Sequence, residues 1–251
     1  MFAMTVVLVH GNPETAAIWG PLVAALGRQD VVLLSPPGFG APLPDDFPAT
    51  YLAYRDWLEA ELERIETPID LVGHDWGGGH VVNAVMHRPE LVRSWASDVV
   101  GLFDPDYVWH DFAQTWQTPG EGEELVDTLL GGTVEDRAGR MAALGIPMDV
   151  ATLMAPEQGP EMGRAILALY RSARQPAMAE AGRDLERAAA RPGLSLLATD
   201  DPFIGVADNR RRAGDRAGAR TEVLDGLGHW WMVQDPARGA AALTGFWETL
   251  G

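Results

Sequence analysis

The feature of the sequence with the clearest chemistry is a glycine-framed aspartate. The segment Gly73-His74-Asp75-Trp76-Gly77 follows an apolar stretch, residues 69–72, and precedes a stretch with helical character, residues 78–87. A central residue between glycines, in a strand–turn–helix context, is typical of a nucleophile elbow whose side chain is exposed above a sheet. Backbone N–H groups at the helix start face the same spot and can stabilise negative charge. We therefore predict that Asp75 is a nucleophile.

A carboxylate nucleophile restricts the reaction. None of the five serines of the chain lies in such a turn. A carboxylate attacks amides poorly and would convert an ester into an anhydride. It suits substitution at a saturated carbon that carries a leaving group or belongs to a strained ring, which gives an alkyl ester. Water must then cleave that ester, and this step needs a general base.

The base and its acidic partner are predicted from chain order. His229, in Gly228-His229-Trp230, comes after an apolar stretch, residues 221–224, and before the last helix. Asp201 follows the apolar stretch 194–198 and precedes His229, as the third member of such a triad should. It would accept the His229 N–H and stabilise the imidazolium. The adjacent Asp200 leaves an alternative, in which either aspartate only caps a following helix.

A second loop is predicted to stabilise the oxyanion. The segment Val9-His10-Gly11-Asn12-Pro13 directly follows the first apolar stretch, residues 5–9. The backbone N–H of Asn12 could bind the oxyanion together with that of Trp76. Asn12 could also contribute its side-chain amide.

Composition excludes several other chemistries. There is no cysteine, and all nineteen basic residues are arginine. Thiolate zinc sites, a cysteine nucleophile, Schiff bases and a phosphate-loop lysine are therefore excluded. The formal charge of −17 argues against nucleic acid or an anionic membrane as partner. We expect a cytoplasmic protein without a secretion signal or membrane span. We also expect it to need no metal or organic cofactor and to act on a small hydrophobic organic substrate.

Strand-like and helix-like stretches alternate except in the middle of the chain. Six short apolar runs suit buried parallel strands: residues 5–9, 30–34, 69–72, 92–100, 194–198 and 221–224. Helix-like stretches, residues 16–27, 51–65 and 78–87, lie between the early runs. The alternation predicts a mostly parallel, doubly wound α/β sheet. Residues 101–191 read as a helical cap inserted into a core made of residues 1–100 and 192–251.

The motifs together resemble one enzyme group. His10-Gly11-Asn12-Pro13-Glu14, the elbow around Asp75 and Gly228-His229-Trp230 are similar to the signatures of epoxide hydrolases and haloalkane dehalogenases, within the α/β-hydrolase superfamily. The resemblance implies the α/β-hydrolase fold and a covalent alkyl-enzyme intermediate. It also suggests Asp98 as an alternative triad acid, because some dehalogenases place theirs after the corresponding strand. Asp98 falls one residue short of the usual position, and one residue reverses side-chain direction in a strand.

The resemblance implies different leaving-group donors in the two branches. Leu169-Tyr170-Arg171 resembles the cap segment whose tyrosine donates a hydrogen bond to an epoxide oxygen. Phe112 stands where a second such tyrosine is expected, so Tyr107 or His110 could take its place. In the dehalogenase branch, Trp76 and Asn12 would instead hold the departing halide.

We expect, first, an epoxide hydrolase that converts a hydrophobic epoxide to a vicinal diol through Asp75, His229, Asp201 and Tyr170. The alternative is a haloalkane or haloacid dehalogenase with the same triad, and the second alternative is a ligand-binding protein that kept the fold. Trp230 is predicted to contact substrate. An apolar pocket wall is expected from aromatic and methionine side chains, namely Trp109, Trp116, Met148, Met154, Trp230 and Trp231.

Overall fold

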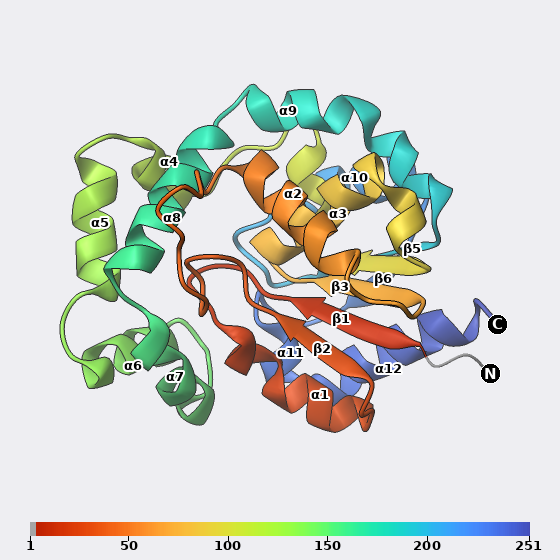
Figure 1. Cartoon of the computed structure of the whole chain (residues 1–251), viewed down its shortest axis with the longest axis horizontal. Helices are drawn as coiled ribbons and strands as arrows, with labels where there is room; N and C mark the ends of the chain where they lie inside the picture. The colour runs from red at the N-terminus through yellow and green to blue at the C-terminus, as the bar shows by residue number, and fades with distance from the viewer. Residues whose placement is uncertain (1–3) are drawn as a thin grey trace.

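A single parallel sheet forms the centre of the molecule (Figure 1). The structure, a computed structural model, describes residues 4–251, so residues 1–3 of the predicted core segment lie outside the described residues. The six strands are ordered β2-β1-β3-β4-β5-β6, and every neighbouring pair is parallel. They are β1 Thr5–Val9, β2 Val31–Leu34, β3 Ile69–Gly73, β4 Ser94–Ser97, β5 Gly193–Ala198 and β6 Ala219–Leu224. The strand–helix alternation of the sequence thus predicted the sheet correctly.

Helices cover both faces of the sheet because its central strands are buried on both sides. One face carries α1 Gly20–Leu26, α11 Trp231–Gln234 and α12 Pro236–Glu248, and the other carries α2 Tyr51–Leu62, α3 Trp76–His87 and α10 Ala207–Arg216 (Figure 1). All five residues of β3 and all six of β5 are buried. Two apolar clusters result, one for each face of the sheet.

The strand predicted for residues 92–100 is shorter than expected. β4 comprises only Ser94–Ser97, and its pairing with β3 ends where Ser97 lies opposite Gly73. The Ser97 hydroxyl then accepts the N–H of Val99, which turns the chain out of the sheet. Asp98 consequently stands just beyond the strand end and is free of the ladder.

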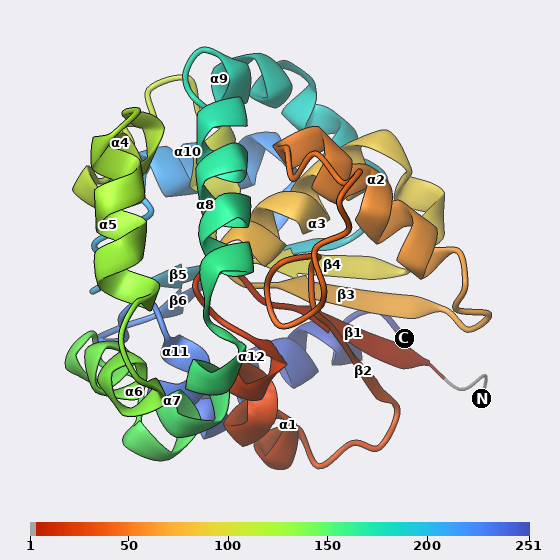
Figure 2. The ribbon, with the colours of Figure 1, turned by 60° about the vertical axis from the view of Figure 1, so that its left-hand side comes forward.

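Only helices lie between β4 and β5 in the described residues. They are α4 Asp111–Gln117, α5 Glu121–Leu130, α6 Val134–Ala143, α7 Met148–Met154, α8 Pro160–Ser172 and α9 Ala177–Ala181. 3₁₀ segments lie before them at Val100–Phe103, between α7 and α8 at Ala155–Glu157, and after them at Gly182–Ala190. Figures 1 and 2 show α4 to α8 beside the carboxyl ends of the strands. Open parallel sheets bind ligands at this edge.

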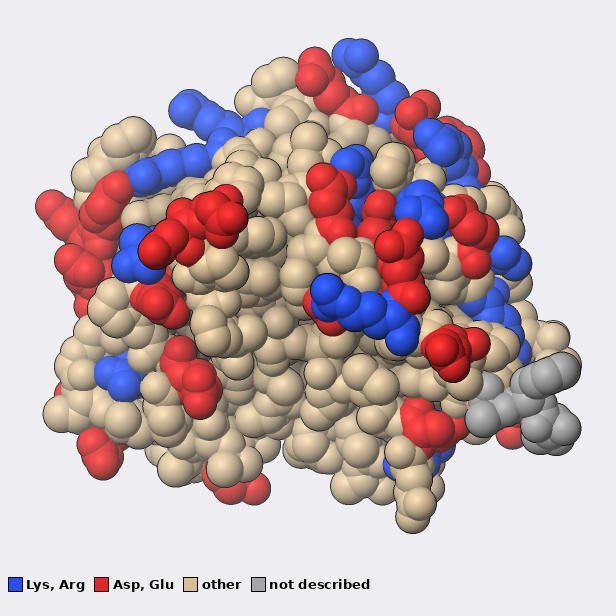
Figure 3. Space-filling model, viewed as in Figure 1, with Lys and Arg blue, Asp and Glu red and all other residues tan. Residues whose placement is uncertain are grey.

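The face of the molecule seen in Figure 3 is mixed in charge. Acidic and basic side chains are interspersed over the face shown in Figure 3, with uncharged surface between them. Among the described residues, no helix is both long and apolar enough to cross a bilayer.

Candidate active site

The backbone at Asp75 is strained as an elbow requires. Asp75 has φ 50° and ψ −129°, outside the region that non-glycine residues favour, directly before α3. A Cβ on Gly77 would lie 2.1 Å from the Val9 carbonyl oxygen, so the helix start can approach β1 only with glycine there. This close approach places the Asp75 side chain at the strand ends.

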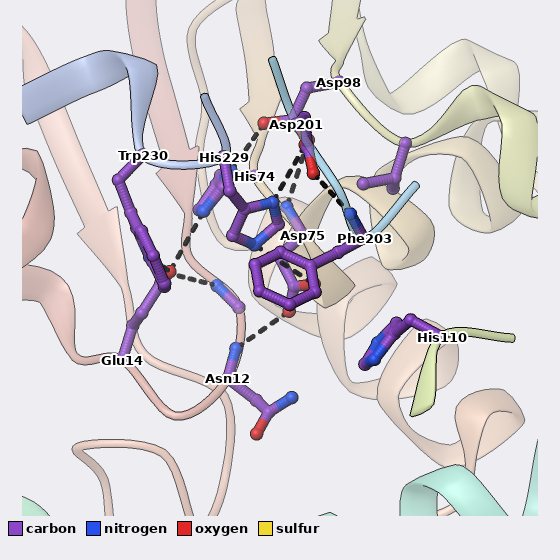
Figure 4. A network of polar contacts seen from close by, with 12 residues as sticks. Asn12, Glu14, His74, Asp75, Asp98, His110, Asp201, Phe203, His229 and Trp230 are labelled. Atoms are coloured by element: carbon purple, nitrogen blue, oxygen red, sulfur yellow. Dashed lines mark hydrogen bonds and ion pairs between the residues drawn. The ribbon is translucent and has the colours of Figure 1, made fainter. Parts of the chain in front are cut away.

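Three side chains predicted for the triad lie together (Figure 4). His229 Nδ1 lies 2.9 Å from Asp201 Oδ2, and His229 Nε2 lies 3.7 Å from Asp75 Oδ2. With Nδ1–H donating to Asp201, Nε2 is the unprotonated nitrogen of the neutral ring and faces Asp75. Asp201 also accepts the N–H of Phe203 at 2.8 Å, which fixes the loop after β5.

The ionisation of the three groups reflects burial and mutual charge. Burial tends to lower the pKa of His229, but Asp201 outweighs it, and the pKa is raised above its ordinary value. Burial raises the pKa of Asp75, which the nearby His229 partly counteracts. Asp201 is also buried, yet His229 and the Phe203 N–H hold its pKa at about 2. Asp201 therefore stays charged while the other two groups titrate.

Asn12 contacts both the elbow and the cap. Its backbone N–H donates to Asp75 Oδ1 at 3.0 Å. No such bond from the Trp76 backbone is found in residues 4–251. The neighbouring Gly11 is required because a Cβ there would lie 2.2 Å from Asp75 Oδ1.

The side chain of Asn12 is engaged by Tyr170 of α8. Asn12 Nδ2 donates to the Tyr170 hydroxyl oxygen at 2.9 Å. The Trp76 ring stands edge-on to Tyr170, with 5.5 Å between ring centroids. Burial and the charge of Asp75 raise the pKa of Tyr170 well above its ordinary value, so the phenol keeps its proton. Asn12 and Trp76, the pair considered for halide, thus both contact this phenol.

A small cavity opens onto Asp75. Its volume is about 40 Å³, space for a few water molecules. Its lining is mostly apolar and comprises Asn12, Pro13, Asp75, His110, Phe112, Trp116, Leu129, Met141, Leu144, Tyr170, Phe203, His229 and Trp230. A second cavity of about 10 Å³ adjoins Asp75 on the side of Trp76 and Trp109.

The expected pocket wall needs correction at three positions. Trp116 and Trp230 line the main cavity, whereas Met148 is 55% exposed and Met154 is buried in the core. Trp231 is also fully buried and donates its indole N–H to Asp98 at 2.7 Å. Met148 lies at the exposed start of α7 and Met154 packs into an apolar cluster, so neither methionine lines the cavity.

A second charged network, which the sequence did not reveal, lies behind the triad (Figure 4). His74 lies between two carboxylates, 2.5 Å from Asp98 through Nδ1 and 3.0 Å from Glu14 through Nε2. Burial opposes ionisation of His74, but the two carboxylates raise its pKa well above the ordinary value. Asp98 also accepts the backbone N–H of Asp75 at 3.0 Å, and Trp230 donates to Glu14 at 2.7 Å.

This network occupies Asp98, so the alternative triad acid is not the partner of His229. One signal in the sequence could have identified Glu14 as part of this network. Glu14 directly follows Pro13 in a buried segment, and a buried charge must be paired. In the described residues, Glu14, His74 and His229 place ligand atoms within 4.8 Å of one another, as a metal site would. Hydrogen bonds to carboxylates already use both His74 nitrogens and Nδ1 of His229.

Comparison with known proteins defines the family. The sequence profile of the alpha/beta hydrolase family matches residues 6–242, nearly the whole chain. The chain therefore belongs to the alpha/beta hydrolase family.

Individual relatives include a haloalkane dehalogenase of Mesorhizobium japonicum, which is 30% identical over 138 residues, 49% of this chain and 42% of that protein. The chain thus matches less than half the length of this curated relative. A solved haloalkane dehalogenase from Bradyrhizobium elkani superposes with a TM-score of 0.74 at 21% identity, covering 98% of this chain and 92% of the other. An N-formylmaleamic acid deformylase from Pseudomonas putida reaches 0.76 at 16% identity, with 96% and 92% covered. At such identities the structures support the fold alone.

Proposed function

We propose that the protein is a dehalogenase of small haloalkanes in which Asp75 is the nucleophile. The observation that carries the proposal is the Asp75 carboxylate in a strained elbow, 3.7 Å from a histidine whose other nitrogen is held by Asp201. The similarity to the Mesorhizobium haloalkane dehalogenase favours halide over epoxide oxygen as the leaving group, in place of the epoxide hydrolase expected first. The small apolar cavity suits a small, uncharged substrate.

In the first step, an Asp75 oxygen attacks the saturated carbon. The carbon–halogen bond breaks, and its electron pair leaves with the halide. Asp75 Oδ2 faces His229 and Oδ1 accepts the Asn12 N–H, so the carboxylate is held in one orientation. The product is a neutral alkyl ester on Asp75.

In the second step, His229 Nε2 takes a proton from water, and the resulting hydroxide attacks the carbonyl carbon of the ester. The Asn12 N–H stabilises the oxyanion, and Asp201 stabilises the imidazolium. Collapse expels the alkoxide, which takes the proton from His229 and leaves as the alcohol. The Asp75 carboxyl group then loses its proton to solvent and is again a carboxylate. Only the neutral His229 ring accepts the proton, so the rate of this step should rise with pH through the pKa of His229. That pKa lies above its ordinary value, which moves the rise to higher pH.

The second candidate is an epoxide hydrolase, and one observation favours it. The Tyr170 hydroxyl is buried in the same cavity as Asp75, and Asn12 donates to its oxygen, which leaves its proton available to a ring oxygen. The first step would then open the epoxide, with the ring oxygen as the leaving atom of the same molecule.

A trapped intermediate distinguishes these candidates. The His229→Gln variant is incubated with bromopropane or epoxypropane, and its intact mass is recorded. Loss of His229 removes the base and also lets the pKa of Asp75 rise, so the reaction is run at about pH 8. Added mass equal to bromopropane less hydrogen bromide supports dehalogenation, whereas added mass equal to the whole epoxide supports epoxide hydrolysis.

The control is the double variant Asp75→Ala/His229→Gln, in which neither probe should add mass. An adduct in this double variant would place the nucleophile elsewhere. No adduct in His229→Gln from either probe would count against both candidates and favour the non-catalytic alternative.

A further inference from the structure

Helix α10 carries three consecutive arginines, and only the first of them is buried. Arg210 is 4% exposed, whereas Arg211 and Arg212 lie at the surface. Within residues 4–251, Arg210 is the one arginine in the protein interior. A guanidinium stays charged in proteins, and a buried charge is costly unless opposite charges and hydrogen bonds compensate it. The surroundings of Arg210 should therefore contain the groups that compensate this charge.

Arg210 contacts the chain just beyond two neighbouring strands. Its Nη1 donates to the carbonyl oxygen of Ala198, the last residue of β5, at 2.8 Å. Its aliphatic stem packs against the 3₁₀ segment that follows Asp98, where a Cβ on Gly101 would lie 2.9 Å from Arg210 Cγ. Asp201 comes shortly after Ala198 in the chain. Arg210 thus lies where the segments that carry the two buried aspartates leave the sheet.

The charge of Arg210 acts on both of these aspartates. Burial lowers the pKa of Arg210, and the carboxylates of Asp201 and Asp98 oppose that effect. Burial raises the pKa of Asp201, whereas His229 and Arg210 are among the groups that lower it. No hydrogen bond joins Arg210 to a carboxylate within residues 4–251, so its charge acts on both aspartates at longer range. This cation favours the ionised Asp201 even while His229 is neutral and ready to accept a proton.

We propose that Arg210 is a positioning residue, which holds Asp201 where it can orient His229 during ester hydrolysis. This inference rests on the proposed reaction at Asp75 and adds to it a residue outside the triad. The bond to Ala198 fixes the end of β5, from which the chain turns to Asp201, and the guanidinium charge favours the carboxylate form. Asp201 acts through His229 in the second step only. Arg210 should therefore affect cleavage of the ester and not the attack on carbon.

The test compares the two chemical steps in a variant of this arginine. Arg210→Met keeps an unbranched side chain but removes the charge and every donor. Ester hydrolysis in a single turnover with bromopropane should slow about 10- to 100-fold, since a displacement of about 1 Å in a reacting group can cost about 100-fold. Adduct formation in the His229→Gln background should stay within about threefold of His229→Gln alone. Arg210→Lys, which keeps the charge, should hydrolyse the ester at a rate between those of Arg210→Met and the parent.

Arg212→Met is the matched control. Arg212 belongs to the same helix and donates to the buried Asp104 at 2.6 and 2.9 Å, so its loss also leaves a buried carboxylate without its arginine. Both chemical steps should proceed at the parent rate in this variant, because Asp104 is not part of the triad. If Arg210→Met does not fold, Gly101→Ala provides the same test, since its Cβ would displace the Arg210 stem while the arginine is kept. Gly101→Ala should then slow ester hydrolysis and not adduct formation.

A second readout needs no substrate. At a pH where the His229 ring is neutral, nitrogen-15 NMR spectra of the parent should show the Nδ1–H tautomer, since Asp201 accepts that proton. Arg210→Met should also populate the Nε2–H tautomer, whereas Arg212→Met should not. An unchanged tautomer, hydrolysis within about threefold of the parent, or an equal loss in both steps would overturn this role of Arg210. No adduct in His229→Gln would instead overturn the proposed function, and a change of tautomer in Arg210→Met would still support the positioning of Asp201.

Discussion

Two buried aspartates at neighbouring strand ends hold two different histidines. Asp201, after β5, accepts from His229, whereas Asp98, after β4, contacts His74. Only in the first arrangement does the other ring nitrogen of the histidine face Asp75. Removing the charge of Asp201 should therefore change ester hydrolysis, whereas removing the charge of Asp98 should change the free energy of unfolding.

Asp201→Asn should slow ester hydrolysis about 1,000-fold or more, because the imidazolium loses its partner. The rise of the hydrolysis rate with pH should also move to lower pH, since Asp201 is the group that raises the pKa of His229. Pre-steady-state kinetics across pH would measure both effects. A rise that stays at its original pH would contradict this role of Asp201.

Asp98→Asn should move that rise far less than Asp201→Asn, because the carboxylate bonded to His229 is that of Asp201. Its effect should be on folding. Loss of one carboxylate from the buried His74 pair should lower the free energy of unfolding by about 3 kcal/mol. Urea denaturation at neutral pH would measure this. The control is Asp200→Asn, at an exposed position directly before Asp201.

Glu14 should make stability depend on acid. Burial tends to raise the pKa of the Glu14 carboxyl, but His74 and neighbouring histidines outweigh it and hold the pKa at about 2, below the 4.5 of an unfolded chain. Its contribution is therefore complete above pH 4.5 and is lost as pH falls toward 2. Glu14→Gln should be less stable than the parent near neutrality by about 3 kcal/mol, and the difference should shrink below pH 4.5. A difference that stays constant in urea unfolding between pH 5 and about pH 3 would contradict this.

The sequence could predict some of these residues and not others. Asp75, Asp201 and His229 each stand after an apolar strand in a fixed chain order, so local pattern and order suffice to bring them together. Glu14 and His74 are 60 positions apart, and their pairing depends on β1 and β3 being neighbours in the sheet. No local pattern carries that information.

At the scale of elements, the approach of α3 to β1 controls the elbow. Gly77→Ala should lower the free energy of unfolding by about 3 kcal/mol or more, since its Cβ would overlap the Val9 carbonyl oxygen. A Cβ on Gly245, within α12, would meet no neighbouring atom within 4 Å, so Gly245→Ala should raise stability by up to about 1 kcal/mol. Thermal denaturation of the pair would test this. If both substitutions changed the free energy of unfolding equally, helix propensity and not contact with Val9 would determine the effect of Gly77→Ala.

The elements themselves were largely predictable. Runs of apolar residues identify the buried parallel strands because both faces of such strands are covered. β4 is the exception, since the apolar residues Val99 and Val100 are buried although they lie outside the sheet. The predicted strand was therefore too long, because apolar residues that are buried outside a sheet look the same in the sequence as those of a strand. The apolar content of α7 likewise could not say that neither of its methionines lines the cavity.

At the scale of the whole molecule, the proposed site joins the ends of several strands. Asn12 follows β1, Asp75 follows β3, Asp201 follows β5 and His229 follows β6. Hydrolytic activity and the far-UV circular dichroism of the sheet should therefore disappear at the same urea concentration. Loss of activity well before the spectral change would mean that α4 to α8 detach first.

The same arrangement has a consequence for how the protein is made. The bond between Glu14 and Trp230 spans 216 positions, so the site depends on contacts between the two ends of the chain. We expect contacts this distant in sequence to form late in folding, because closing the long loop between the two residues costs conformational entropy before the contacts are made. During synthesis, Asp75 would emerge long before His229 exists. An incomplete chain would thus carry the proposed attacking group without the base that frees it, and an ester formed on Asp75 could be hydrolysed only once His229 is in place.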